Sequence, residues 1–251
     1  MQLPQQRIIL ALDVGSGEEA LKLVHMLRGS VGFFKVGLEL LNSASITIVQ
    51  EITKLGGKVF LDGKFHDIPN TVAGASRAVT RSGVSMFNVH TMGGMEMMKF
   101  AAIAAEEESS KLEIERPAIL GVTILTSVDQ DILNQQLGIT GDMEAQVVHL
   151  AELAEEAGLD GVIASPHEIE AIRKHVSKQM LVVTPGVRPT WAAAQDQKRI
   201  MTPGEAILRG ASYLVIGRPI TKPPAEIGTP VDAAKQVAEE IATALAKQEA
   251  K

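Results

Sequence analysis

Eight short apolar runs, each followed by a segment with helical periodicity, limit the fold of this sequence more than any other feature. The runs are rich in Val, Ile, Leu and Phe, and they lie at residues 7–12, 31–36, 58–61, 85–90, 118–125, 161–164, 180–184 and 213–216. Short buried strands that alternate with helices are typical of a parallel sheet. Eight such units in 251 residues match the size of a (β/α)8 TIM barrel, which is therefore the predicted α/β fold.

The helical segments follow the same order along the chain. They are expected at residues 18–27, 45–55, 71–82, 95–107, 144–157, 167–175, 202–209 and 231–247. Polar residues 106–110 are expected to form a loop, as is the longer connection around 129–142. The alternative fold is a doubly wound open sheet, but its glycine-rich phosphate fingerprint is reduced here to Gly15 and Gly17. No internal linker or repeat divides the chain, so a single domain over residues 1–251 is expected.

Composition excludes several classes of function. The chain has 30 acidic and 24 basic side chains and a net charge of −6, which argues against binding to nucleic acid or to anionic membranes. It has no cysteine, so thiolate catalysis, disulfides and cysteine metal sites are excluded. The first seven residues lack an apolar signal core, and no apolar run is long enough to span a bilayer. These features predict a cytoplasmic protein.

The stretch 60–72 concentrates charge directly after the third apolar run. If the backbone stays extended, Asp62 and Lys64 point to the same side, since side chains alternate along a strand. Asp67 follows, and Pro69 then suits the first turn of a helix. The simple interpretation of Asp-x-Lys-x-x-Asp is a surface network of salt bridges. The functional interpretation is a lysine whose proton is controlled by neighbouring carboxylates.

The barrel prediction places many polar side chains at one rim, because the active sites of these folds lie at the carboxyl ends of the strands. Side chains at these ends are those of Asp13, Lys35, Asp62, Lys64, His90, Thr126, Ser127, Ser165, Arg188 and Arg218. This convergence favours a functional centre over scattered surface charges.

The last two strand ends predict a phosphate site. Loops after strands seven and eight often bind phosphate in TIM barrels. Here they contain Pro185-Gly186-Val187-Arg188 and Gly217-Arg218. Glycine allows backbone amides to approach a phosphate, and arginine can bind it through two hydrogen bonds. The loop 190–197 lies between them and is a candidate lid over the ligand.

These motifs support a resemblance to a known family. The stretch 62–71, Asp-Gly-Lys-Phe-His-Asp-Ile-Pro-Asn-Thr, resembles the signature of the orotidine 5'-phosphate decarboxylase family. Residues 8–13, 184–189 and 216–219 extend the similarity over nearly the whole chain. One departure is Gly63, where the family usually has an apolar residue, often leucine; glycine loosens the backbone beside the lysine.

The resemblance implies metal-free decarboxylation of orotidine 5'-phosphate (OMP) to UMP in pyrimidine biosynthesis, without an organic cofactor. Lys64 would protonate the pyrimidine carbon as carbon dioxide leaves, with Asp62 beside the scissile carboxylate. Lys35 and Asp67 would complete the charged network. The resemblance also implies a homodimer, in which Asp67 and Thr71 come from the neighbouring subunit.

The substrate-binding residues are carried over in the same way. Asp13 would hold the ribose, and Thr126 and Ser127 would lie at the pyrimidine, with the bonding group of the two left open. The remaining substrate-binding residues, on the phosphate side, would be Pro185, Arg188, Gln197, Gly217 and Arg218.

Two other functions remain open from the sequence. Related barrels that act on sugar phosphates share the Asp-x-Lys-x-x-Asp core but use magnesium, with an acidic residue on the second strand where this chain has Lys35. The non-enzymatic alternative is a barrel that binds a phosphorylated ligand without converting it.

Overall fold

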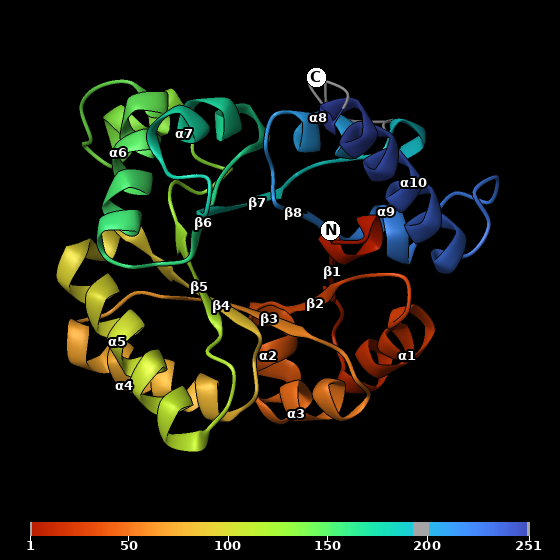
Figure 1. Cartoon of the computed structure of the whole chain (residues 1–251), viewed down its shortest axis with the longest axis horizontal. Helices are drawn as coiled ribbons and strands as arrows, with labels where there is room; N and C mark the ends of the chain where they lie inside the picture. Colours follow the sequence, from red (N-terminus) through yellow and green to blue (C-terminus); the bar gives the residue numbers. More distant parts are fainter. Residues whose placement is uncertain (1, 193–200, 250–251) are drawn as a thin grey trace.

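A computed structural model describes residues 2–192 and 201–249 and contains a closed barrel of eight parallel strands in sequence order (Figure 1). The strands are β1 Ile8–Ala11, β2 Phe33–Val36, β3 Val59–Phe65, β4 Met86–His90, β5 Ala118–Val122, β6 Gly161–Ile163, β7 Leu181–Pro185 and β8 Tyr213–Ile216. β1 pairs with both β2 and β8, which closes the ring. The predicted (β/α)8 barrel is confirmed.

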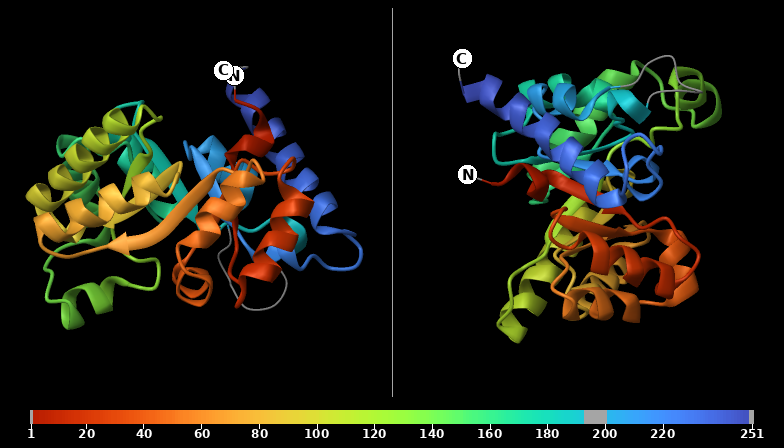
Figure 2. Two further views of the ribbon diagram at one scale, coloured as in Figure 1. Left: turned by 90° about the horizontal axis from the view of Figure 1, so that it is seen from below. Right: turned by 90° about the vertical axis from the view of Figure 1, so that its right-hand side faces the viewer.

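Helices surround the barrel, as Figure 1 shows. They are α1 Gly17–Leu27, α2 Leu38–Ala44, α3 Thr47–Lys54, α4 Pro69–Arg81, α5 Gly94–Leu112, α6 Met143–Glu156, α7 Ile169–His175, α8 Pro203–Leu208, α9 Arg218–Thr221 and α10 Pro230–Glu249. Short helical turns occur at Pro4–Arg7, Thr91–Gly93, Ile132–Gln136, Pro166–Glu168 and Thr190–Ala192. The turn Pro4–Arg7 packs against α10 (Figure 2). No described helix combines the length and the apolar character needed to cross a membrane.

The core has two parts because strand side chains alternate between the two faces of the barrel wall. Side chains that point outward, such as Ile8 and Leu10, join the large cluster under the helices. A smaller buried cluster is formed by Ile9, Phe33, Phe60, Met86, Leu120 and Val183. The interior of the barrel is therefore packed with apolar groups, which form a floor below the carboxyl ends of the strands.

The expected loop at residues 106–110 is wrong, because α5 continues to Leu112. These polar residues remain helical because α4 packs alongside α5 and supplies partners for their charges. Arg77 lies 3.1 Å from Glu107, and Arg81 lies 3.0 Å from Glu108. Short helices α2 and α9 were also not predicted, since segments of seven and four residues carry too little periodicity.

Strand β3 departs from the expected end at residue 61 and runs on to Phe65. Its pairing with β4 becomes irregular there: Leu61 pairs with Phe87, and the next pair is Phe65 with Val89. Three residues of β3 therefore lie opposite the single residue Asn88, which makes this segment a β-bulge. Bulges redirect side chains, and this one contains Asp62 and Lys64.

Candidate active site

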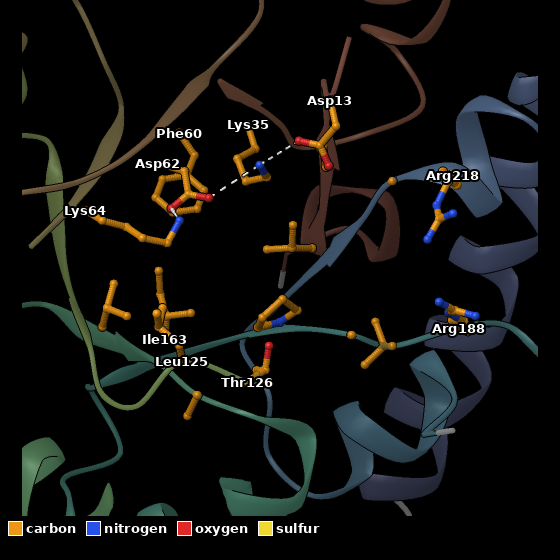
Figure 3. Close-up of a pocket in the computed structure, with 18 of the residues that line it drawn as sticks. Asp13, Lys35, Phe60, Asp62, Lys64, Leu125, Thr126, Ile163, Arg188 and Arg218 are labelled. Carbon is orange, nitrogen blue, oxygen red and sulfur yellow. Dashed lines mark hydrogen bonds and ion pairs between the residues drawn. The ribbon is translucent and has the colours of Figure 1, made fainter. Parts of the chain in front are cut away.

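Four alternating charges form a chain across the carboxyl ends of β1, β2 and β3 (Figure 3). Lys35 Nζ lies 3.0 Å from Asp13 Oδ1 and 3.4 Å from Asp62 Oδ2. Lys64 Nζ lies 2.6 Å from Asp62 Oδ1. The sequence places these groups together because each continues an interior-facing series, in which Asp62 follows Phe60 and Lys35 follows Phe33. Asp62 and Lys64 meet as predicted, but the backbone is not the regular extended strand assumed for that prediction, because β3 bulges here and Lys64 has a positive φ.

The carboxylate of Asp62 is the buried centre of this chain, with 14% of its side chain exposed. Burial alone raises the pKa of Asp62. The charge of Lys35, the hydrogen bond and charge of Lys64, and the hydrogen bond from Asn88 outweigh burial and lower that pKa below its ordinary value. Asp62 is therefore held as an anion between two cations.

Glycine at position 37 makes room for the buried ammonium of Lys35. A Cβ atom at Gly37 would lie 2.8 Å from Lys35 Nζ, so a side chain there would displace the ammonium from its present position. At Gly63 the nearest group is the ring of Phe65, whose Cε1 would lie 2.9 Å from an added Cβ. Gly63 has no positive φ, so it is not required by its backbone conformation. Its missing side chain leaves space for Phe65, which packs 6.0 Å from Phe87 between ring centres.

Lys64 has a left-handed backbone, with φ of 49°, in a region that costs a non-glycine residue about 1–3 kcal/mol. Its backbone N–H donates to Asn88 Oδ1 over 2.7 Å, and Asn88 Nδ2 donates to Asp62 Oδ1 over 2.8 Å. Asn88 is fully buried in β4. One carboxamide thus contacts both the lysine backbone and its carboxylate partner.

A cavity of about 380 Å³ opens above the charged chain. Its polar end carries Lys35, Asp62 and Lys64, while Arg188 and Arg218 lie at the opposite end (Figure 3). The wall between the two ends is mainly apolar and includes Phe60, Val122, Ile124, Leu125, Ile163, Ala164, Val187 and Val215. The cavity therefore suits an elongated ligand with an anionic group at each end.

The two arginines are placed by the loops after β7 and β8. Gly186 has φ of 79° directly after β7, a conformation that favours glycine. The next residue, Val187, pairs with Met201, and the Arg188 N–H donates to the Met201 carbonyl over 3.1 Å. Gly217 precedes α9, which begins at Arg218. The phosphate-side residues Pro185, Arg188, Gly217 and Arg218 all line the cavity.

Other predicted residues are placed less uniformly. Asp13 and Thr126 line the cavity, whereas Ser127 does not. Asp67 and Thr71 are exposed outside the four-charge chain, and Asp67 accepts a hydrogen bond from the Ile68 N–H over 2.7 Å. Gln197 and most of the expected lid at 190–197 lie outside the described residues.

Asn88 and the apolar wall of the cavity were not predicted from the sequence. The signal for Asn88 was present, since it is the one amide within the otherwise apolar strand Met86–Val89. The ring of the histidine beyond it, His90, lies 5.4 Å from the ring of His66 between centres, with the two planes tilted by 39°. Burial, and then the charges of His66 and Lys64, lower the pKa of His90 against the opposing effect of Asp62.

The arrangement favours chemistry that creates negative charge beside Lys64. A fixed ammonium in a poorly hydrated site stabilises such charge and can deliver a proton to it. Within the described residues, no three His, Asp or Glu side chains are grouped so that they could hold a metal ion. The chain has no cysteine to add to such a set.

Comparisons with known proteins agree over almost the whole chain. A model described as the orotidine 5'-phosphate decarboxylase / HUMPS family matches residues 6–237. A curated orotidine 5'-phosphate decarboxylase from Syntrophomonas wolfei is 51% identical over 238 residues, 94% of this chain and 98% of the relative. One from Moorella thermoacetica is also 51% identical, over 94% of this chain and 92% of its own length. The crystal structure of the Lactobacillus acidophilus enzyme aligns with a TM-score of 0.82 and 35% identity, covering 93% of this chain and 98% of that one.

Proposed function

The chain belongs to the orotidine 5'-phosphate decarboxylase / HUMPS family, and on that premise we propose that its Asp13–Lys35–Asp62–Lys64 chain carries out the reaction. The protein is a carboxy-lyase of pyrimidine biosynthesis that converts OMP to UMP and carbon dioxide. The observation that carries the mechanism is the 2.6 Å contact between Lys64 Nζ and Asp62 at the polar end of the cavity.

In the proposed mechanism the bond between the pyrimidine ring and its carboxylate breaks, and the electron pair stays on the ring carbon. Carbon dioxide leaves, and Lys64 donates a proton from Nζ to that carbon. The ammonium stabilises the developing charge before the proton moves. Asp62 is kept anionic by two lysines and lies next to the substrate carboxylate. The two negative charges repel each other in the bound substrate, and this repulsion decreases as the charge moves from the carboxylate to the ring carbon in the transition state.

Phosphate binding is assigned to the end of the cavity opposite the charged chain. Arg188 and Arg218 bind the phosphate, together with the backbone at Gly217, and Gln197 is the additional phosphate-side residue. Asp13 binds the ribose, while Thr126 and Ser127 are the candidates for the pyrimidine. The separation of the arginines from Lys64 in Figure 3 supports this division. Binding energy from the phosphate then holds the ring against the charged chain.

The proposal includes a homodimer in the cytoplasm that uses neither metal nor organic cofactor. Asp67 and Thr71 are exposed near the start of α4, so both are accessible to a neighbouring subunit. Lys35 on β2 stands where the magnesium-dependent sugar-phosphate barrels have an acidic residue, and it is paired with Asp13 and Asp62. This pairing favours the metal-free reaction.

The mechanism predicts that Lys64→Ala folds but loses at least about 10³-fold in kcat, because the variant lacks both the proton donor and the charge. The measurement is the ultraviolet change as OMP becomes UMP, with EDTA present. Lys58→Ala is the matched control, since Lys58 lies directly before the first residue of β3 and does not line the cavity. Undiminished turnover by Lys64→Ala would contradict the mechanism, and loss of wild-type turnover in EDTA would contradict the metal-free reaction.

A further inference from the structure

We propose that Asn88 is a positioning residue for the decarboxylation, and that its carboxamide sets the relative placement of Lys64 and Asp62. This inference rests on the function proposed above. Asn88 does not line the cavity, so it acts through the two residues that do. Three features give Asn88 this role: the bulge in β3, the polarity of the amide and its complete burial.

The bulge creates the need for Asn88. Between the pairs Leu61–Phe87 and Phe65–Val89, the regular register of β3 and β4 is lost. The Lys64 N–H is directed instead to the Asn88 side chain, at 2.7 Å. A side chain thus replaces a main-chain partner where the strand leaves its regular path, and it supports the left-handed conformation of Lys64.

The amide also has a defined orientation. Oδ1 faces the N–H donor of Lys64, and Nδ2 faces the carboxylate acceptor of Asp62 at 2.8 Å. In the reverse orientation Nδ2 would face the Lys64 N–H, donor against donor, and Oδ1 would face the Asp62 carboxylate, acceptor against acceptor. The partners therefore select one orientation of the amide. The Lys64 ammonium and Asn88 Nδ2 both donate to the same atom, Asp62 Oδ1. Asn88 therefore links the backbone of Lys64 to the oxygen that the Lys64 ammonium contacts.

Burial makes this linkage rigid. Asn88 has no exposed surface, so water does not readily replace a lost hydrogen bond, and the partner group is left unsatisfied. By contrast, 29% of the Lys64 side chain is exposed, and four methylene groups give it freedom to move. The fixed points that limit this freedom are its backbone and Asp62, and Asn88 binds both.

Two variants with the same branching separate the two hydrogen bonds. Asn88→Asp keeps an acceptor for the Lys64 N–H but places a carboxylate oxygen, in place of the Nδ2 donor, against Asp62. Asn88→Leu keeps the number and branching of the heavy atoms and removes both bonds. Thr184→Val is the matched control, because Thr184 is a fully buried polar residue of β7, three strands away from β4 in the same barrel, and does not line the cavity.

The experiment measures kcat and KM for OMP, the Kd for UMP and thermal unfolding of all four proteins. Misplacement of the reacting groups predicts that kcat falls about 10- to 100-fold in both Asn88 variants. KM and the Kd for UMP should change by less than about threefold, since the phosphate contacts remain. The acid limb of the kcat profile should move to higher pH, because Asp62 loses a bond to its anionic form. Thr184→Val should match the wild type.

Each result has a definite meaning. If the wild type turns over OMP and both Asn88 variants keep kcat within about twofold of it, the positioning role of Asn88 is overturned and the proposed function stands. Losses of kcat, UMP affinity and thermal stability in parallel would also overturn it, because they indicate a general structural role. A wild-type protein without OMP turnover would overturn the proposed function, and the inference would fall with it.

Discussion

Lys64 combines an unfavourable backbone with the central position in the proposed chemistry. Its φ of 49° is one of three positive values at non-glycine residues in the described parts of the chain. Such strain persists only where surrounding contacts compensate for it, and the two bonds of Asn88 and the pair with Asp62 are those contacts. At this site, folding free energy is used to hold a lysine in a conformation that the isolated chain would avoid.

Glu168 provides a test of residue-scale electrostatics away from the cavity. It ends the turn after β6 and accepts a hydrogen bond from the Ser165 N–H over 2.9 Å. Burial raises the pKa of Glu168 from 4.5 to about 7; the bond from Ser165 opposes this shift, and the charge of Glu144 adds to it. The folded protein therefore binds a proton at this residue over a pH range where the unfolded chain has released it.

This shift predicts that the free energy of unfolding decreases as pH rises from 4.5 to about 7, by on the order of 1 kcal/mol from this residue. The contribution is fully present below the unfolded pKa and is lost as pH rises through the folded one. Glu168→Gln should remove it, so urea unfolding at several pH values should show a smaller decrease than in the wild type. Glu170→Gln, on an exposed part of α7, is the control. Equal pH dependence in wild type and Glu168→Gln would contradict the assignment.

At the scale of elements, the sequence predicted the alternation of strands and helices but not the irregular segments. The strand runs were detectable because each is apolar and bounded by polar or glycine residues. The contact between Asp62 and Lys64 was expected from strand alternation, but Lys64 makes it from a left-handed backbone within the bulge. The bulge, and hence the role of Asn88, depends on the pairing of β3 with β4, which no local pattern records. The extension of α5 depends on ion pairs with α4, which are contacts between separate elements.

Two glycines, one inside a helix and one just after a helix, predict opposite effects of the same substitution. Gly74 lies inside α4, and an added Cβ would contact nothing within 4 Å. Gly74→Ala should raise the free energy of unfolding by about 0.5–1 kcal/mol through higher helix propensity. Gly158 follows α6 with φ of 83°, so Gly158→Ala should lower stability by about 1 kcal/mol or more. Chemical denaturation measures both, and changes of the same sign would contradict these conformations.

At the scale of the whole molecule, charge is distributed unevenly. The chain carries a net charge of −6. Among the described residues, by contrast, the cavity is lined by the cations Lys35, Lys64, Arg188 and Arg218 and by two carboxylates, those of Asp13 and Asp62. A local excess of cations in a concave site concentrates an anionic ligand even on an acidic protein. Folding thus gives the cavity a charge opposite to that of the chain as a whole.

The charged cavity predicts that KM for OMP rises severalfold when ionic strength increases from about 0.02 M to about 0.5 M, because salt screens the attraction. The kcat should change little, since the short contacts around Asp62 are largely buried. Steady-state kinetics in a buffer free of phosphate measures both quantities. Arg218→Met should have a higher KM at low salt and a weaker salt dependence. A KM independent of salt in the wild type would contradict electrostatic attraction.

The closed ring of strands also has a consequence for self-association. Each of the eight described strands is paired on both sides, so the sheet has no edge to which another chain can add a strand. Edge-to-edge aggregation is thereby blocked by the topology itself. Contact between two copies must instead use helices and loops, whose side chains are specific to each surface. The start of α4, with Asp67 and Thr71 exposed, is a surface of that kind.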